Sequence, residues 1–178
     1  MYPHHLRQLC QPGDHHPRAA PDHLHQHDED RPGRSRVRKE NTMTKQELIR
    51  AAFAAREKAY APYSRFKVGA ALEAKDGRVF TGCNIESATY TPTCCAERTA
   101  LVKAVSEGVR EFSRIAIVGA AEGKVNTLVT SPCGVCRQFL YEFGGDELQV
   151  ILAKSEDDYL EMTLGELLPI GFGPANLE

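Results

Sequence analysis

Cysteines are the residues of this sequence best suited to chemistry, because no histidine follows His27 while five cysteines follow residue 42. Cys133 and Cys136 form a C-x-x-C pair behind a proline, a spacing that lets two thiolates converge on one ion at the start of a helix. A redox dithiol has the same spacing, but it needs neither a third cysteine nor a partnered carboxylate. Structural disulfides are disfavoured in a reducing compartment. We therefore expect one Zn²⁺, bound by Cys95, Cys133 and Cys136.

Three ligands leave one position of a tetrahedral zinc ion open, which is typical of a catalytic site. A fourth thiolate from Cys83 or Cys94 would instead close the site and make it structural. Glu97 favours catalysis, since a carboxylate two residues after a cysteine ligand, followed downstream by Pro-Cys-x-x-Cys, matches the signature of zinc deaminases. A regular helix separates residues 95 and 97 by roughly 200°, so we expect the cysteine to occupy the cap position before the helix.

Several segments around these residues are similar to a known family. After FKVGAAL, the segments GCNIESATY, CAER and SPCGVCRQFLYEFG follow in the order found in the small homotetrameric zinc-dependent cytidine deaminases, which the chain resembles. The resemblance runs from about Leu48 to Phe172. Two residues depart from it: Ser87 stands where many relatives have Asn, and Cys94 doubles the ligand cysteine. The C-x-E spacing selects Cys95 as the ligand.

The resemblance implies a reaction and the residues that perform it. It implies a homotetramer, with one zinc ion per subunit, that deaminates cytidine and 2'-deoxycytidine to uridine and 2'-deoxyuridine with release of ammonia, in pyrimidine salvage. Glu97 would take the proton of a water acidified by the zinc, deliver it to N3 and protonate the departing amine. Independently of the resemblance, Arg98 lies three residues after Cys95 on the same helix face, so we expect it to hydrogen-bond the ligand sulfurs and offset their charge; the alternative is an ordinary surface charge. The other implied contacts are Phe66 on the pyrimidine, Asn84 and Glu86 on the ribose hydroxyls, the backbone N–H of Ala96 on the developing alkoxide, and Tyr90 and Phe172 from neighbouring subunits.

Two further considerations bear on the substrate class. Residues 84 and 86 alternate at a strand end, so their side chains point to the same side and can contact one sugar together. A carboxylate beside the sugar repels phosphate, which favours a nucleoside over a nucleotide.

Three other functions are weighed against this one. A deaminase of an aminopyrimidine antibiotic should lack the pair of Asn84 and Glu86, and a polynucleotide deaminase should have a basic channel. A zinc-stabilised binding module, the alternative outside enzymes, would need four protein ligands and no catalytic carboxylate.

The elements that must position these residues alternate between helix and strand. Thr44 and Glu47 have the spacing of a capping box, which predicts a helix over 45–60 that ends before Pro62. The later elements are strands 66–74 and 79–85 around an Asp-Gly turn, helix 95–107, strand 114–119, helix 133–143 and strand 148–153. This order predicts an α/β fold with a mixed sheet, and the resemblance implies the three-layer α/β/α arrangement of cytidine deaminases.

Composition divides the chain near residue 42. Residues 1–42 contain all seven histidines, five of the ten prolines and few large aliphatic side chains, so we expect a disordered tail that cannot bury a core. The predicted catalytic domain is 43–178, and Met43 is a candidate for the natural start.

Charge and hydropathy exclude several classes of partner. Lys and Arg number 22 against 24 Asp and Glu, a net charge of -2 that argues against nucleic-acid binding. No run of 18 apolar residues occurs, which excludes a membrane-spanning helix, and the N-terminus lacks the apolar stretch of a secretory signal. We therefore expect a cytoplasmic protein whose partner is a small-molecule nucleoside.

Overall fold

A computed structural model describes residues 42–177 of the chain, and the tail predicted for 1–42 lies outside this range apart from its last residue. The elements, in order, are α1 (Lys45–Arg56), β1 (Phe66–Ala74), β2 (Val79–Cys83), α2 (Ala96–Ser106), β3 (Phe112–Ala121), α3 (Gly134–Gly144), β4 (Gln149–Ala153), β5 (Tyr159–Thr163), α4 (Leu164–Leu167) and the short 3-10 helix η1 (Pro174–Asn176). None of the helices in the described part is long and apolar enough to cross a membrane.

The five strands form one sheet in the order β2-β1-β3-β4-β5. Only β3 and β4 are parallel, and every other neighbouring pair is antiparallel. Parallel strands need a long crossover connection, and here that connection contains α3. The predicted mixed sheet is therefore confirmed.

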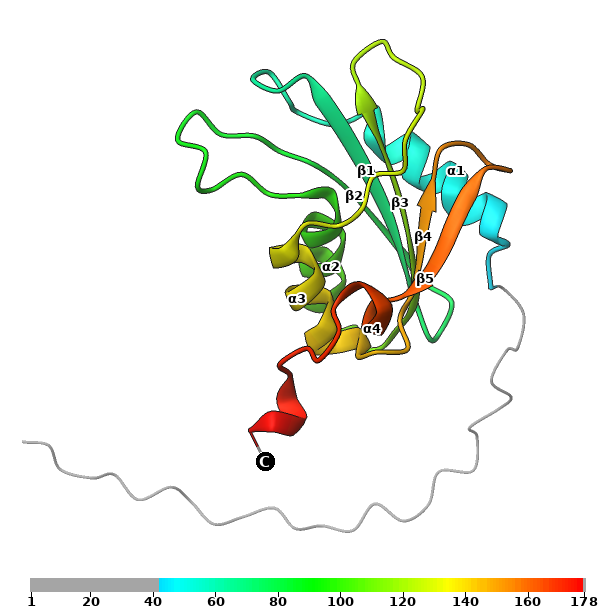
Figure 1. The fold of residues 1–178 in the computed structure, drawn as a ribbon, viewed down its shortest axis with the longest axis vertical. Coiled ribbons are helices and arrows are strands. Elements are labelled where there is room, and N and C mark those ends of the chain that lie inside the picture. The colour runs from blue at the N-terminus through cyan, green and yellow to red at the C-terminus, as the bar shows by residue number, and fades with distance from the viewer. Residues whose placement is uncertain (1–41, 178) are drawn as a thin grey trace, which may run out of the picture. The chain divides into compact units, whose positions relative to one another are not determined.

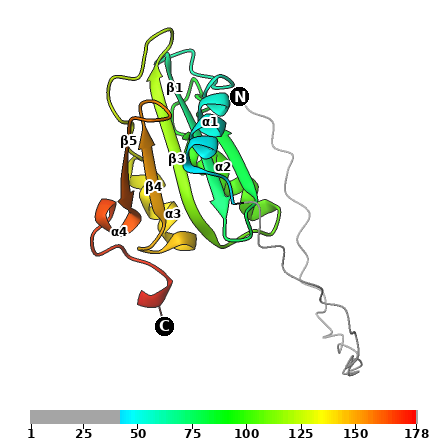
Figure 2. The ribbon, with the colours of Figure 1, turned by 90° about the vertical axis from the view of Figure 1, so that its right-hand side faces the viewer.

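Both faces of the sheet are covered by helices, which gives three layers. Side chains alternate along the strands: Ile115 and Ile117 pack in the core under α2 and α3, whereas Ala116 and Val118 pack in a second core under α1. Figure 1 and Figure 2 show α1 on one face and α2 with α3 on the other. The predicted three-layer α/β/α class is confirmed.

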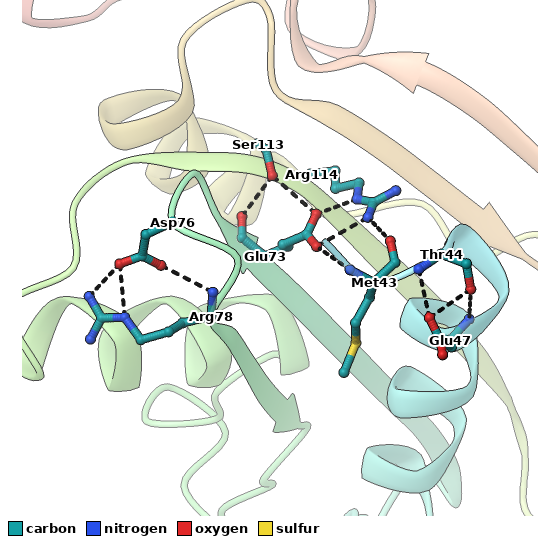
Figure 3. Close-up of polar contacts among 8 residues, drawn as sticks. All are labelled: Met43, Thr44, Glu47, Glu73, Asp76, Arg78, Ser113 and Arg114. Atoms are coloured by element: carbon teal, nitrogen blue, oxygen red, sulfur yellow. Dashed lines mark hydrogen bonds and ion pairs between the residues drawn. The ribbon is translucent and has the colours of Figure 1, made fainter. Parts of the chain in front are cut away.

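The start of α1 is fixed by polar contacts (Figure 3). Thr44 and Glu47 form the predicted capping box, in which each side chain bonds the other residue's backbone N–H. Just before it, the N–H of Met43 donates to the buried carboxylate of Glu73 at 3.2 Å, and the guanidinium of Arg114 bonds both that carboxylate and the carbonyl of Met43. These contacts fasten the first helix to β1 and β3.

Helix α2 lies directly on β2 because β2 contains Gly82. A Cβ built on Gly82 would be 2.4 Å from both the carbonyl oxygen of Ala96 and the backbone nitrogen of Ala100. No side chain fits between the strand and this helix. The close approach sets the position of the first turn of α2, which follows Cys95.

Several predicted boundaries differ from the structure. The first helix ends at Arg56 and not at residue 60, because the N–H groups of Lys58 and Ala59 turn to carbonyls three residues back. Strand β2 ends at Cys83 and not at Ile85. Beyond Cys83, the side-chain amide of Asn84 hydrogen-bonds the backbone N–H of Val68 and the carbonyl of Phe66 on β1. Neither β5 nor α4 was predicted from the sequence.

Candidate active site

Three cysteine side chains meet where α2 and α3 begin. Cys95 is the N-cap residue of α2, with extended backbone (φ −73°, ψ 156°), and Cys133 is the N-cap residue of α3 (φ −66°, ψ 166°). Cys136 lies in the first turn of α3 and is fully buried. The Sγ of Cys133 is 3.9 Å from the Sγ of Cys95 and 3.5 Å from that of Cys136. The structure thus places Cys95 at the predicted cap.

The spacing of the three sulfurs fits a zinc ion. All three lie within 4.8 Å of one another. Zn–S bonds of ~2.3 Å in a tetrahedron place neighbouring sulfurs about 3.8 Å apart, close to the distances observed. Of the two alternatives for a fourth ligand, Cys94 accepts from the hydroxyl of Thr99 and Cys83 donates to the carbonyl of Lys58. Neither joins the group found among residues 42–177, so the cluster offers three thiolates and one open position.

The thiols perturb one another's ionisation. A hydrogen bond from Cys136, reinforced by the guanidinium of Arg98 and by Cys133, lowers the pKa of Cys95 to about 5 although burial opposes the shift. The same hydrogen bond raises the pKa of Cys136 far above its usual range. Neither N-cap cysteine makes a side-chain capping bond to its helix. The first-turn N–H groups, which have no intrahelical partners, are therefore free to stabilise sulfur anions.

Glu97 is a buried carboxylate beside the sulfur cluster. It lies in the first turn of α2, two residues after Cys95, and is only 4% exposed. Burial raises its pKa to about 7, and the Cys95 thiolate acts in the same direction, while a hydrogen bond with Cys136 opposes the rise. A buried acid at this position can exchange a proton with a group held at the open position of the cluster.

The segment that contains Asn84 and Glu86 runs alongside the approach to α2. Ile85 exchanges two backbone hydrogen bonds of 2.9 Å with Cys94. On the other side, the backbone of Tyr60 accepts from Glu86 and donates to Asn84. This small three-stranded arrangement brings the two predicted ribose contacts next to the cap of α2.

The side chains of these two residues already have protein partners. The amide of Asn84 accepts from and donates to the β1 backbone, including the carbonyl of Phe66, at 2.8 Å each. Glu86 accepts from the backbone N–H groups of Tyr63 and Ser64 and from the Ser64 hydroxyl. The Ser64 hydroxyl is the main cause of a lowered pKa at Glu86. A carboxylate held ionised in this way accepts hydrogen bonds only.

Phe66 borders a hollow of about 670 Å³. The other walls are the end of β3 and the loop over 124–130, which leads toward Cys133. Val125, Leu128 and Val129 of this loop are exposed apolar side chains. Phe66 is the one predicted site residue that lines this hollow. The loop was not predicted from the sequence; its apolar residues outside any strand or helix pattern were the available signal.

Known proteins share both the sequence and the fold. Residues 42–152 match the family described as "Cytidine and deoxycytidylate deaminase zinc-binding region". The chain belongs to this family. A cytidine deaminase from Sporosarcina psychrophila is 48% identical over 135 residues, which cover 76% of this chain and 96% of that protein. The crystal structure of cytidine deaminase from Burkholderia pseudomallei is 51% identical, with a TM-score of 0.66, and the match covers 73% of this chain and 100% of that one.

The family's zinc belongs at the cluster of Cys95, Cys133 and Cys136, because these are the sulfurs that the described fold brings together. Arg98 lies beside them. One of its terminal nitrogens donates to the carbonyl of Thr93 at 2.7 Å, while its Nε is buried with no protein partner among the described residues. The N–H groups of this guanidinium that have no protein partner can donate toward the sulfurs, and its positive charge lies beside them.

The remaining predicted residues occupy two kinds of environment. Ala96 is fully buried in the first turn of α2, next to the zinc site of this family member. Tyr90 and Phe172 lie outside the sulfur cluster and are 70% and 59% exposed. The backbone of Tyr90 has a positive φ of 58°, and its ring lies 5.9 Å from that of Tyr63. The side-chain amide of Gln138 on α3 donates a hydrogen bond to the carbonyl of Phe172 at 2.7 Å.

Proposed function

We propose that this protein hydrolyses cytidine and 2'-deoxycytidine to uridine and 2'-deoxyuridine, releasing ammonia, as an enzyme of pyrimidine salvage. The observation that supports this most directly is the pairing of a three-thiolate zinc site, which has one open position, with the buried carboxylate of Glu97. Relatives that share about half of its residues across most of the chain are named cytidine deaminases. The described cysteines are all free thiols, which fits a reducing, cytoplasmic setting.

The proton transfers fall to Glu97. Zinc, when bound, supplies the Lewis acidity that lowers the pKa of a water from ~15.7 toward ~7. Glu97 accepts a proton from that water and delivers it to N3 of the pyrimidine as oxygen adds to C4. The second proton of the water reaches the exocyclic amine through the same carboxylate, the C4–N bond breaks, and ammonia leaves. The balance is cytidine plus water to uridine plus ammonia.

Residues around the reacting atoms supply charge and orientation. The backbone N–H of Ala96, free of an intrahelical partner at the first position of α2, is the proposed donor to the developing oxyanion. The guanidinium of Arg98 offsets the net charge of -1 that three thiolates and Zn²⁺ carry together. These groups are in place before the substrate arrives, so no reorganisation opposes the reaction.

Substrate selection rests on the groups at the ends of β1 and β2. Phe66, in the wall of the hollow, would pack on the pyrimidine ring. Asn84 and Glu86 would hydrogen-bond the ribose, using the second amide hydrogen of Asn84 and the one carboxylate lone pair of Glu86 that their protein partners leave free. The anionic Glu86 disfavours a phosphorylated sugar, which supports a nucleoside substrate.

A homotetramer is the proposed assembly. Tyr90 and Phe172 would then reach the pockets of neighbouring subunits. On α3, Val135 is 62% exposed and Phe139 is 37% exposed, beside a shallow hollow of about 600 Å³. Apolar side chains gathered on one helix face are typical of a protein–protein contact. The molar mass in solution tests this assembly directly.

Glu97→Gln tests the proposed function. The substitution keeps the size of the side chain and all three thiolates, so zinc content should stay at one per chain while ammonia release from cytidine falls by ~10²–10⁴ or more. Glu107→Gln, at the exposed end of the same helix, is the matched control. A Glu97→Gln protein whose turnover falls less than about tenfold would contradict the acid–base role. Loss of zinc along with turnover would instead make Glu97 a ligand.

A further inference from the structure

Arg137 follows the zinc cysteine Cys136 directly, and its side chain makes three hydrogen bonds. Nε donates to the carbonyl of Pro132 at 2.8 Å, one terminal nitrogen donates to the carbonyl of Leu167 at 2.6 Å, and the other donates to the hydroxyl of Ser131 at 2.9 Å. No contact of this guanidinium is used in the mechanism above. Its three acceptors come from two segments that are more than thirty residues apart in the chain.

One side-chain contact of Arg137 and its backbone N–H hold the peptide groups on either side of Cys133. The carbonyl of Pro132, bonded by the side chain, belongs to the peptide that leads into Cys133. The carbonyl of Cys133 itself accepts from the backbone N–H of Arg137 at 2.9 Å. With both flanking peptides fixed, the backbone of Cys133 stays in the extended cap conformation that directs its thiolate toward Cys136 and Cys95.

The side-chain contact with Leu167 connects the same turn to the rest of the fold. Leu167 is the last residue of α4, so the guanidinium joins the start of α3 to the segment that follows the last strand. Every acceptor is a neutral oxygen, and among residues 42–177 no carboxylate pairs with Arg137 at ion-pair distance. By contrast, Arg50 forms an exposed ion pair with Glu156. The geometry of Arg137 is that of a planar fork fitted to fixed acceptors.

We propose that Arg137 is a positioning residue that holds the turn of Cys133 and Cys136 in the geometry of the zinc site. This inference rests on the zinc site of the proposed function. The residue does not touch the ion; it restrains the backbone from which the thiolates project. Residues that orient metal ligands from behind typically contribute a factor of 10–100 in metal affinity. Loss of Arg137 should therefore weaken zinc binding in a protein that remains folded.

The test is the rate at which zinc leaves the folded, zinc-loaded full chain. Wild type, Arg137→Ala, Arg137→Lys and the control Arg50→Ala are each mixed with an excess of a chromogenic chelator, and the appearance of the zinc complex is followed below the melting temperature. Arg137→Ala should release zinc about 10- to 100-fold faster than wild type. Arg137→Lys should also be faster, since a single ammonium cannot reach three separated acceptors. Arg50→Ala should match wild type within about twofold, because its exposed pair lies in another part of the fold.

Circular dichroism on the same samples separates positioning from general stability. A folded Arg137→Ala protein that releases zinc within about twofold of wild type overturns the proposal, even if its melting temperature is lower. If Arg137→Ala does not fold, Arg137→Lys decides the matter by the same criterion. Ammonia release by the wild type is measured separately: stoichiometric zinc without deamination of cytidine would reject the proposed function and leave the conclusion on Arg137 standing.

Discussion

Gly82 allows the link between the fold and the site to be tested with one methyl group. A Cβ at this position would lie 2.4 Å from the Ala96 carbonyl oxygen and the Ala100 backbone nitrogen, and 3.0 Å from the carbonyl carbon of Thr99. These are backbone atoms, which cannot rotate away. Restoring an ordinary contact of about 3.5 Å requires helix α2 to move by about 1 Å.

Gly82→Ala should lower stability and activity through this one displacement. Overpacking of this kind costs about 1–3 kcal/mol. At roughly 3–5 °C per kcal/mol for a domain of this size, the melting temperature should fall by about 3–15 °C. The clash is at the end of α2 that contains Cys95 and Glu97. A misplacement of about 1 Å there can lower turnover about 10²-fold, and it also weakens zinc binding by moving one thiolate away from the others.

The assay combines thermal unfolding by circular dichroism, zinc by elemental analysis and ammonia released from cytidine. Gly134→Ala is the matched control: Gly134 also neighbours a zinc cysteine, yet a Cβ there would meet no atom within 4 Å. The control should keep all three quantities near wild type. A Gly82→Ala protein with unchanged melting temperature, zinc content and turnover would refute the reasoning that α2 is positioned by direct contact with β2.

Three other predictions concern the ligands, the first helix and the chain before Met43. Cys95→Ala should remove zinc and turnover together while Cys94→Ala keeps both, as elemental analysis and the ammonia assay will show; zinc retained in Cys95→Ala would reassign the ligand. The backbone N–H of Thr44 and its hydroxyl lower the pKa of Glu47 below its ordinary 4.5. The ionised Glu47 of the capping box therefore stabilises the fold fully above pH 4.5, and this stabilisation is lost as the pH falls through the lower pKa of the folded state. The difference in melting temperature between wild type and Glu47→Gln should shrink in acid; a difference that does not change with pH would contradict this stabilising role of Glu47. A chain that starts at Met43 should match the full chain in melting temperature and turnover, and a clear loss of either would show that the preceding residues contribute to the fold.

Elements with a strong local signal could be predicted from the sequence. The capping box at Thr44 and the Asp-Gly turn after β1 lie where they were expected, because hydrogen bonds between near neighbours determine them. The apolar runs of β3 and β4 are buried on both faces and were recognisable without any partner. The cap position of Cys95 followed from helix geometry combined with the requirement that Cys95 and Glu97 face one metal site.

What could not be predicted depends on contacts between distant segments. Strand β5 is an edge strand with the half-exposed sequence YLEMT, and it is specified by pairing with β4 more than by its own pattern. The end of β2 depends on the amide of Asn84, which bonds the β1 backbone sixteen and eighteen residues away. The loop over 124–130 has no periodicity, so its place in the wall beside Phe66 is visible only in the folded chain. The contacts of Arg137 belong to the same class.

Cysteine at two N-cap positions explains how one small site can hold three thiolates. A hydroxyl or carboxylate cap, such as Thr44 on α1, bonds the first turn and stabilises a helix by about 1 kcal/mol. Cys95 and Cys133 make no such bond, so α2 and α3 forgo that stabilisation and keep their first-turn N–H groups free. Three thiolates and Zn²⁺ sum to a charge of -1, and two helix N-termini, each equivalent to about +0.5, add to the compensation that the guanidinium of Arg98 supplies. Both helices contribute to it only if they begin at the same point in space. Contact with Gly82 sets that point for α2, and we infer that Arg137 sets it for α3.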